Sequence, residues 1–200
     1  KPAEIDMKKR INEILQSCKE PDDNVKNYMK KRGLITPDSL FSGRYYFEKN
    51  LTDCMIAKVS KGNKLVGLHA TYIKNGEKLG RRMYAVEKGS MMGGAVRLHK
   101  LNGGESIVIG EGIETSLSAS IITGLPAWAA LDAGKLEVVE IPDVIKKVVI
   151  AADNDLSYTG QKSAYILAHR LQMQGKQVEV IIPETKGTDF NDYHKTKIAN

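Results

Sequence analysis

Apolar side chains recur at helical spacing near the start of the chain. Residues 3–17 carry theirs on one face, which predicts an amphipathic helix. Those apolar residues are Ile5, Ile11, Ile14 and Leu15. A second helix is predicted up to Lys31, with Asp22 or Asp23 as its cap and Gly33 as its stop.

The middle of the chain is rich in the β-branched and aromatic residues that favour strands. Residues 44–47, 54–59 and 65–73 are the predicted strands. Turn sequences at residues 61–64 and 74–77 contain the Gly and Asn that tight hairpins need. The pattern therefore predicts a small antiparallel sheet.

From residue 105 onward, short apolar strands alternate with helices. The predicted strands are residues 106–109, 127–130, 147–152 and 177–182. The predicted helices are residues 114–123 and 159–174, the second ending at Gly175. Strands that are apolar throughout and alternate with helices are typical of a parallel, doubly wound α/β sheet.

These patterns divide the chain into three parts. We predict an N-terminal helical segment over residues 1–40 and a small α+β subdomain with antiparallel strands over residues 41–104. An α/β domain follows over residues 105–200, with the boundary near residues 102–104.

Two of the predicted parallel strands end in acidic residues. Glu111 follows the first strand between Gly110 and Gly112, and Asp153 and Asp155 follow the strand at residues 147–152. Ligands of open α/β sheets bind at the carboxyl ends of strands, so neighbouring strands would bring these carboxylates together.

Close carboxylates repel one another, and a divalent cation removes that conflict. Oxygen ligands of this kind favour Mg²⁺ or Mn²⁺. The alternative is that acids at strand ends are solvated or cap the next helix, and it applies most to Asp155. For Glu111 and the Asp-x-Asp pair we favour the metal site.

The same segments resemble the Toprim domain shared by primases, topoisomerases and some nucleases. The motifs that carry the resemblance are residues 110–115 (Gly-Glu-Gly-Ile-Glu-Thr), 124–130, 151–155 (Ala-Ala-Asp-Asn-Asp), 187–192 and 93–98. They are similar to the Toprim domains of phage, plasmid and conjugative-element primases, over most of residues 41–194. The resemblance implies a Rossmann-like parallel sheet with flanking helices, in which Glu111, Asp153 and Asp155 bind catalytic metal.

Three further acids have open roles. Glu114 either supports the metal ligands or supplies a favourable charge at a helix N-terminus. Asp189 and Asp192 either complete the metal site or cap a short C-terminal helix. Asp189 is the better candidate ligand, because it follows the Gly-Thr turn after the last strand.

The chain is moderately basic, with 30 Lys and Arg against 24 Asp and Glu and a net charge of +6. That balance is compatible with a polyanionic partner without identifying one. The candidates for nucleotide or nucleic-acid binding are Arg81, Arg82, Lys88, Arg97 and Lys135. Their alternatives are a solvated sheet edge and, for Lys135, a solvated helix start. The basic run at residues 30–32 is interpreted as a solvated helix end, with nucleic-acid contact as the alternative.

The resemblance implies the catalytic core of a DNA primase. Such a nucleotidyltransferase makes short RNA primers from ribonucleoside triphosphates on a single-stranded DNA template, and a replicative helicase is an expected partner. A Toprim-type nuclease and a non-catalytic nucleic-acid-binding replication module are the alternatives. The acidic residues argue against the module, because a binder of polyanions gains nothing from clustered carboxylates.

The expected cellular location rests on two sequence features, the lack of a membrane-spanning run and the spacing of the cysteines and histidines. No apolar run approaches the roughly 20 residues that cross a bilayer. The 2 cysteines and 4 histidines are not spaced as paired zinc ligands. We therefore expect a cytoplasmic protein with reduced thiols and no membrane contact.

Overall fold

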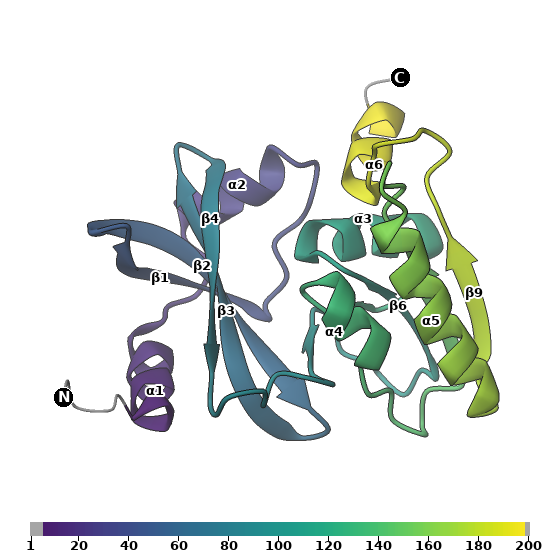
Figure 1. Ribbon diagram of the computed structural model, residues 1–200. Helices are drawn as coiled ribbons and strands as arrows, with labels where there is room; N and C mark the ends of the chain where they lie inside the picture. Colours follow the sequence, from purple (N-terminus) through teal and green to yellow (C-terminus); the bar gives the residue numbers. More distant parts are fainter. Residues whose placement is uncertain (1–5, 199–200) are drawn as a thin grey trace.

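The N-terminal part begins with two capped helices in the computed structural model, which describes residues 6–198 (Figure 1). Asp6 and Asp22 each accept a backbone N–H from the first turn of the helix that follows, at 3.1 and 3.0 Å. The predicted start of the first helix, at residues 3–5, lies outside the described residues. The helices are α1 (Met7–Ser17) and α2 (Asp23–Lys30).

The antiparallel part is larger than the sequence pattern predicts. Its strands are β1 (Leu40–Phe47), β2 (Asn50–Lys61), β3 (Lys64–Lys74), β4 (Glu77–Ala85) and β5 (Ala95–Arg97). The sequence pattern gives no bounds for β4, although the predicted hairpin turn at residues 74–77 implies a strand after it; Glu77, Lys78, Arg81 and Arg82 of this strand are polar and exposed, so it has no continuous apolar pattern. It lies at the edge of the sheet, where a strand needs no continuous apolar face.

The C-terminal part has the predicted alternation of strands and helices. Its elements are β6 (Ser106–Gly110), α3 (Ile113–Thr123), β7 (Ala127–Ala129), α4 (Ala133–Val138), β8 (Lys147–Ala151), α5 (Thr159–Met173), β9 (Gln177–Ile181) and α6 (Phe190–Ile198). Strand β6 is parallel to β7 and β8, and β8 is parallel to β9. The prediction of a parallel α/β sheet is therefore confirmed.

Within residues 6–198, all strands belong to one sheet of nine, in the order β4-β3-β2-β5-β7-β6-β8-β9 with β1 paired to β2. The short strand β5 joins the two halves, because it pairs antiparallel with β2 on one side and with β7 on the other. It precedes the predicted boundary near residues 102–104, whereas its partner β7 follows it. Backbone hydrogen bonding is thus continuous across that boundary.

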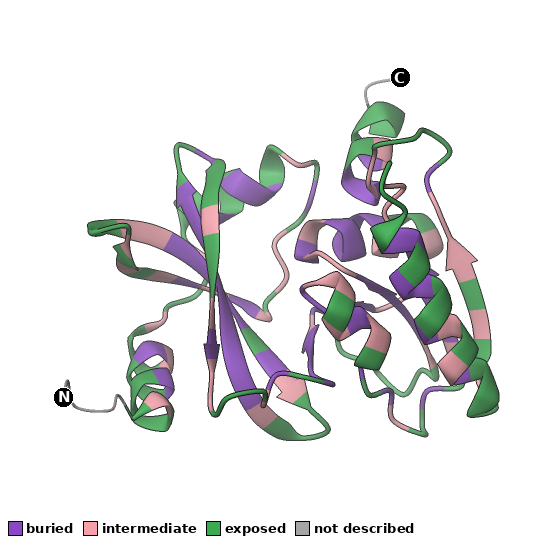
Figure 2. Ribbon diagram, viewed as in Figure 1, coloured by how far each residue is buried: buried purple, intermediate pink, exposed green. Residues whose placement is uncertain are grey.

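Helices cover both faces of the parallel strands (Figures 1 and 2). In β6, Ile107 and Ile109 pack in a cluster with side chains of α4 and α5. Val108, between them, packs in the cluster that contains side chains of α3 and α6. This alternation explains why β6 is apolar throughout. Among residues 6–198, no helix has the length and apolar content needed to span a bilayer.

Candidate metal and nucleotide site

The turn after β6 places Glu111 at the carboxyl end of the parallel strands. A Cβ on Gly110 would lie 3.0 Å from Ser116 Oγ and 3.3 Å from the Ala151 carbonyl oxygen. Ser116 Oγ in turn donates a hydrogen bond to the Gly112 carbonyl at 2.7 Å. Glycine at position 110 therefore lets α3 approach the strand closely, so that Glu111 emerges directly beside β8.

The segment after β8 brings Asp153 and Asp189 together. Asn154 donates its backbone N–H to Thr188 O at 3.0 Å and its side-chain amide to Pro183 O at 2.7 Å. These bonds draw the loop before α6 against the end of β8. Thr115, from α3, donates its hydroxyl to Asp189 Oδ2 at 3.4 Å. Three separate segments thus meet at one point.

An open cleft of about 330 Å³ lies at this point, and we call it the carboxylate cleft. Its acidic residues are Glu111, Glu114, Asp153, Asp189 and Asp192. Its basic residues are Arg32, Lys78, Arg81 and Lys195. Tyr28, Gly112, Thr115, Leu131 and Asn191 complete the lining. Charges of both signs therefore face the same small space.

The carboxylates in the cleft perturb one another. Burial, followed by the charges of Asp189, Glu111 and Asp155, raises the pKa of Asp153 to about 7. Asp153 Oδ1 is buried and has no hydrogen-bond partner. The pKa of Glu111 is also raised, by burial and then by Asp155 and Asp132. These groups form one coupled acidic cluster.

The cluster supplies the kind of ligands that a hard divalent cation takes. Within residues 6–198, no three His, Cys, Asp or Glu side chains are gathered as a ready-formed metal site. The partnerless oxygen of Asp153 and the repulsion among the carboxylates nevertheless fit Mg²⁺ or Mn²⁺, because a cation would satisfy the oxygen and remove the repulsion.

Asp155 has a more peripheral position than the sequence predicts. Its Oδ2 accepts the backbone N–H of Gly160 at 3.0 Å, at the start of α5, and it does not line the cleft. Its charge still raises the pKa of both Asp153 and Glu111. The helix-capping alternative thus holds for one of its oxygens, and metal binding by the other stays a prediction.

Glu114 faces the basic side of the cleft. The hydroxyl of Tyr28 donates a hydrogen bond to Glu114 Oε1. Burial acts to raise the pKa of Glu114, but Lys78, the Tyr28 hydroxyl and Arg32 together lower it below its ordinary value. Glu114 is not among the charges that raise the pKa of Asp153. It therefore interacts with the cations rather than with the acidic cluster.

Asp189 and Asp192 combine both predicted roles. Asp189 Oδ1 accepts the backbone N–H of Asp192 at 2.9 Å, and Asp192 Oδ2 lies 3.4 Å from the backbone N of Asp189. The two residues thus stabilise the start of α6. Both also line the cleft, where the Asp189 charge acts on Asp153.

The structure separates the two neighbouring arginines of β4. Arg81 lines the cleft and donates from Nη1 to the Leu131 carbonyl oxygen at 2.7 Å. Leu131 itself is buried and has a positive φ of 81°, a strained conformation next to the site. Both arginines are exposed, but Arg82 does not line the cleft. Alternation along the strand accounts for the difference.

The other predicted basic residues lie elsewhere. Lys88 is exposed in the turn between β4 and β5. Lys135 forms an ion pair with Asp132, three residues earlier. Arg97 packs over the Trp128 ring, 4.8 Å from its centroid, and donates to the Gly62 carbonyl at 2.5 Å. None of the three lysine and arginine side chains lines the carboxylate cleft.

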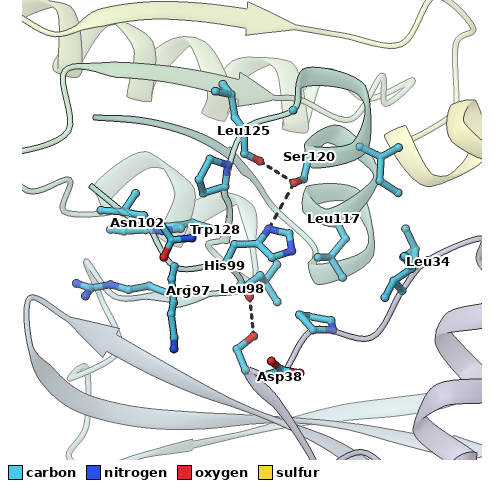
Figure 3. Close-up of a pocket in the computed structure, with 18 residues that line it drawn as sticks. Leu34, Asp38, Arg97, Leu98, His99, Asn102, Leu117, Ser120, Leu125 and Trp128 are labelled. Atoms are coloured by element: carbon cyan, nitrogen blue, oxygen red, sulfur yellow. Dashed lines mark hydrogen bonds between the residues drawn. The ribbon is translucent and has the colours of Figure 1, made fainter. Parts of the chain in front are cut away.

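Arg97 lines a second and larger hollow of about 1110 Å³, which we call the apolar pocket (Figure 3). Leu34, Leu98, Leu117, Ile121 and Leu125 form much of its wall. Within it, Ser120 Oγ donates to the Leu125 carbonyl at 2.6 Å and lies 3.4 Å from His99 Nδ1. The C-terminal half of α3 borders this pocket, whereas the N-terminal turn of α3 borders the carboxylate cleft.

The sequence prediction includes Arg81 of β4 but misses Lys78 and the part that Arg32 has in the cleft. For the basic run at residues 30–32 it favours a solvated helix end over nucleic-acid contact. Arg32 instead stacks on the Tyr28 ring, 3.7 Å from its centroid, and lines the cleft with Lys78. The basic run was the one signal for Arg32, and nothing in the pattern linked it to acids about 80 residues or more away.

Comparisons with known proteins agree with this geometry. Residues 106–199 match the Toprim domain family. No curated protein matches the chain. The DnaG primase catalytic domain bound to single-stranded DNA has a TM-score of 0.60 at 12% identity, covering 96% of this chain and 76% of that one. The primase fragment of the bacteriophage T7 primase-helicase protein has a TM-score of 0.54 at 16% identity, covering 86% and 67%.

The primase of Aquifex aeolicus, with its zinc-binding and RNA polymerase domains, has a TM-score of 0.56 at 14% identity. The match covers 95% of this chain but 56% of that one. At such identities, the likeness establishes a shared fold. The chain therefore has a Toprim-type α/β fold that matches the Toprim domain family over residues 106–199 and is similar to the fold of bacterial and phage primase catalytic domains.

Proposed function

We propose that the chain is the catalytic core of a metal-dependent DNA primase, a nucleotidyltransferase that makes short RNA primers on single-stranded DNA. The observation that carries the proposal is that acids and cations line the same carboxylate cleft. Glu111, Asp153 and Asp189 supply acidic oxygens there, and Arg32 and Arg81 supply positive charges. A nucleoside triphosphate with its metal requires both.

Glu111, Asp153 and Asp189 are the residues that would hold Mg²⁺ or Mn²⁺, with Asp155 behind them. When bound, the cation would neutralise phosphate charge and activate the attacking hydroxyl. Glu111 lies on the turn between Gly110 and Gly112, where a substrate backbone can come close. Its carboxylate can accept a hydrogen bond from that hydroxyl.

The basic side chains would hold the phosphates. Arg32 is positioned by its stack on Tyr28, and Arg81 by its bond to the Leu131 carbonyl. Lys78 adds a third positive charge. Arginine binds phosphate with a planar fork of donors, so these fixed guanidinium groups would orient the triphosphate as well as attract it.

The proposal extends to partners and location. Two of the structures with this fold are described as bound to single-stranded DNA and as part of a primase-helicase protein. We propose single-stranded template, ribonucleoside triphosphates and a replicative helicase as partners of this chain, in the cytoplasm. Cys18 and Cys54 are free thiols.

One assay distinguishes the proposal from its rivals. The protein is incubated with single-stranded DNA, ribonucleotides and Mg²⁺, with Asp153→Asn as the inactive control. New oligoribonucleotide, lost in the variant, supports the primase. Shortened DNA indicates a Toprim nuclease. A mobility shift with neither product, and equal in the variant, indicates a non-catalytic binding module, and either of these last results overturns the proposal.

A further inference from the structure

Tyr28 occupies an unusual position between charges of opposite sign. It lies on α2 and is fully buried. Its hydroxyl donates to the carboxylate of Glu114, while its ring supports the guanidinium of Arg32 at 3.7 Å. Arg32 also donates from Nη1 to the Tyr28 carbonyl oxygen at 3.2 Å, and its Nη2 lies 3.9 Å from the carboxylate of Glu77, an exposed residue. One side chain therefore contacts both an acid and a cation that line the cleft.

Glu114 needs a donor at this position. It lies in the first turn of α3 and is largely enclosed by protein, with Lys78 and Arg32 as the nearest cations. A partly buried carboxylate without a donor takes the nearest available cation as its partner. The Tyr28 hydroxyl is neutral and satisfies Glu114 without using a positive charge.

The backbone around Tyr28 is held by other contacts. Asn191 of α6 donates to the Arg32 carbonyl at 2.9 Å and to Ser118 Oγ at 3.1 Å. His194 Nε2 lies 3.0 Å from the Gly33 carbonyl oxygen. The end of α2 is thus tied to α3 and α6 independently of the Tyr28 hydroxyl, and removing that hydroxyl leaves these contacts in place.

We propose that Tyr28 is a positioning residue that keeps Arg32 and Lys78 available for the triphosphate by satisfying Glu114 in their place. Its ring fixes where the Arg32 guanidinium lies, and its hydroxyl prevents Glu114 from pairing with either cation. The inference rests on the proposed nucleotide site. It assigns to a residue of the N-terminal helical segment a role in substrate affinity, without direct contact between that residue and the substrate.

The test is Tyr28→Phe, which keeps the ring under Arg32 and removes only the hydroxyl. Calorimetry measures the affinity for ATP in the presence of Mn²⁺ and, separately, for Mn²⁺ alone. We expect ATP to bind about ten-fold more weakly, because Glu114 would then form an ion pair with Arg32 or Lys78. Mn²⁺ alone should bind as in the unmodified protein. Tyr45→Phe is the matched control, since the Tyr45 hydroxyl bonds to Ile14 O and Ser17, away from the cleft.

Glu114→Gln provides the second arm. A neutral amide does not compete for Arg32 or Lys78, so the double variant Tyr28→Phe with Glu114→Gln should bind ATP as well as Glu114→Gln alone. Glu114→Gln with Tyr28 intact should bind ATP no more weakly than the unmodified protein. That variant tests the proposal even if Tyr28→Phe does not fold, because a ten-fold loss would contradict it.

Other outcomes are equally decisive. Unchanged ATP affinity in Tyr28→Phe, or an equal loss of Mn²⁺ and ATP binding, overturns the positioning role. Failure of the primase proposal would give a different result from failure of the Tyr28 proposal. If the primase proposal is wrong, Asp153→Asn leaves the affinity for Mn²⁺ and the assay products unchanged, whatever the effect of Tyr28→Phe on ATP affinity.

Discussion

The two ends of helix α3 border hollows that differ in size and in chemistry. The apolar pocket, beside Leu117 and Ile121, is about 1110 Å³. The carboxylate cleft, beside Glu114 and Thr115, is about 330 Å³. The smaller one holds the coupled carboxylates, the partnerless oxygen of Asp153 and the facing cations. The proposed nucleotide site is therefore the smaller of the two hollows, and its volume does not identify it.

The comparison shows which of the two hollows contains unfavourable repulsion between charged groups. Bringing Asp153 close to other acids in a partly buried site costs stability, which only a function or a bound cation compensates. The lining of the apolar pocket contains no such group of acids. The experiments below test whether chemistry is confined to the cleft, beginning with the largest expected effect.

Asp153→Asn should reduce primer synthesis by at least about 100-fold, because it removes a charge from the coupled cluster. The same change should stabilise the metal-free protein above pH 7. The folded-state pKa of Asp153 is raised to about 7, so protonation stabilises the fold at low pH and this contribution is lost as pH rises from about 4 to about 7.

Asparagine does not titrate, so at pH 8 the variant should be more stable by roughly 2–4 kcal/mol, and at pH 4 by nothing. Urea unfolding at both pH values, without metal, measures this. Near-normal synthesis by the folded variant would remove Asp153 from the catalytic site.

The affinity for Mn²⁺ should depend on pH for the same reason. A proton on Asp153 competes with the cation, so affinity should fall about ten-fold per unit below pH 7 and level off above it. Calorimetric titrations between pH 5.5 and about 8.5 give the profile, with Asp153→Asn expected to flatten it. An equally steep profile in that variant would assign the titration to another group.

Arg81→Ala should weaken binding of ATP with Mn²⁺ about ten-fold, because it removes a charged donor from the cleft wall. It should also reduce the slope of log affinity for single-stranded DNA against log salt by about 1 if that arginine contacts the template. Arg82→Ala, one residue along the strand, and Arg97→Ala, at the apolar pocket, are the controls. Equal losses in all three would mean that general basicity, rather than the cleft, attracts the nucleotide.

Gly110→Ala should destabilise the protein by about 1–3 kcal/mol, because the new Cβ would meet Ser116 Oγ at 3.0 Å and the Ala151 backbone oxygen at 3.3 Å. The measurement is thermal or urea unfolding. Gly134→Ala is the matched control, since its Cβ would meet nothing closer than Asp132 Oδ1 at 3.7 Å. That change should be neutral or slightly stabilising within the first turn of α4.

Ile121→Ser should have the smallest effect. Ile121 lines the apolar pocket and is 54% exposed, so the free energy of unfolding should change by less than about 0.5 kcal/mol. Primer synthesis and ATP affinity should not change. A clear loss of either, with the fold intact, would show that both ends of α3 serve the same activity.

The sequence predicted the acidic half of the site because the signals there are local. Gly110 and Gly112 around Glu111, and acids directly after the apolar residues of β8, place carboxylates at strand ends whatever the rest of the fold does. The parallel order of β6 and β8 then brings them together, as the structure shows. The helices and strands with clear apolar periodicity were predicted for the same reason.

The basic half was predicted only in part, because Arg81 was a candidate binding residue whereas Lys78 and Arg32 were not. Lys78 lies on β4, an edge strand whose polar pattern resembles a loop. Arg32 reaches the cleft only because α2 packs beside α3 and α6, a contact between segments more than 80 positions apart. The contact of Asp155 with the start of α5 could not be predicted either, because spacing along an extended strand does not indicate which backbone N–H a carboxylate accepts.

The contact of α6 with the end of α2 has a consequence for how the protein is made. Asn191 and His194 reach carbonyl groups of Arg32 and Gly33, 159 and 161 positions earlier in the chain. During translation, Arg32 and Gly33 leave the ribosome well before Asn191 and His194 do. Until α6 emerges, the nascent chain has its basic residues and Glu111 but lacks Asp189 and the helix that encloses them. The lining of the carboxylate cleft is therefore complete only after residues 189–195 have been synthesised.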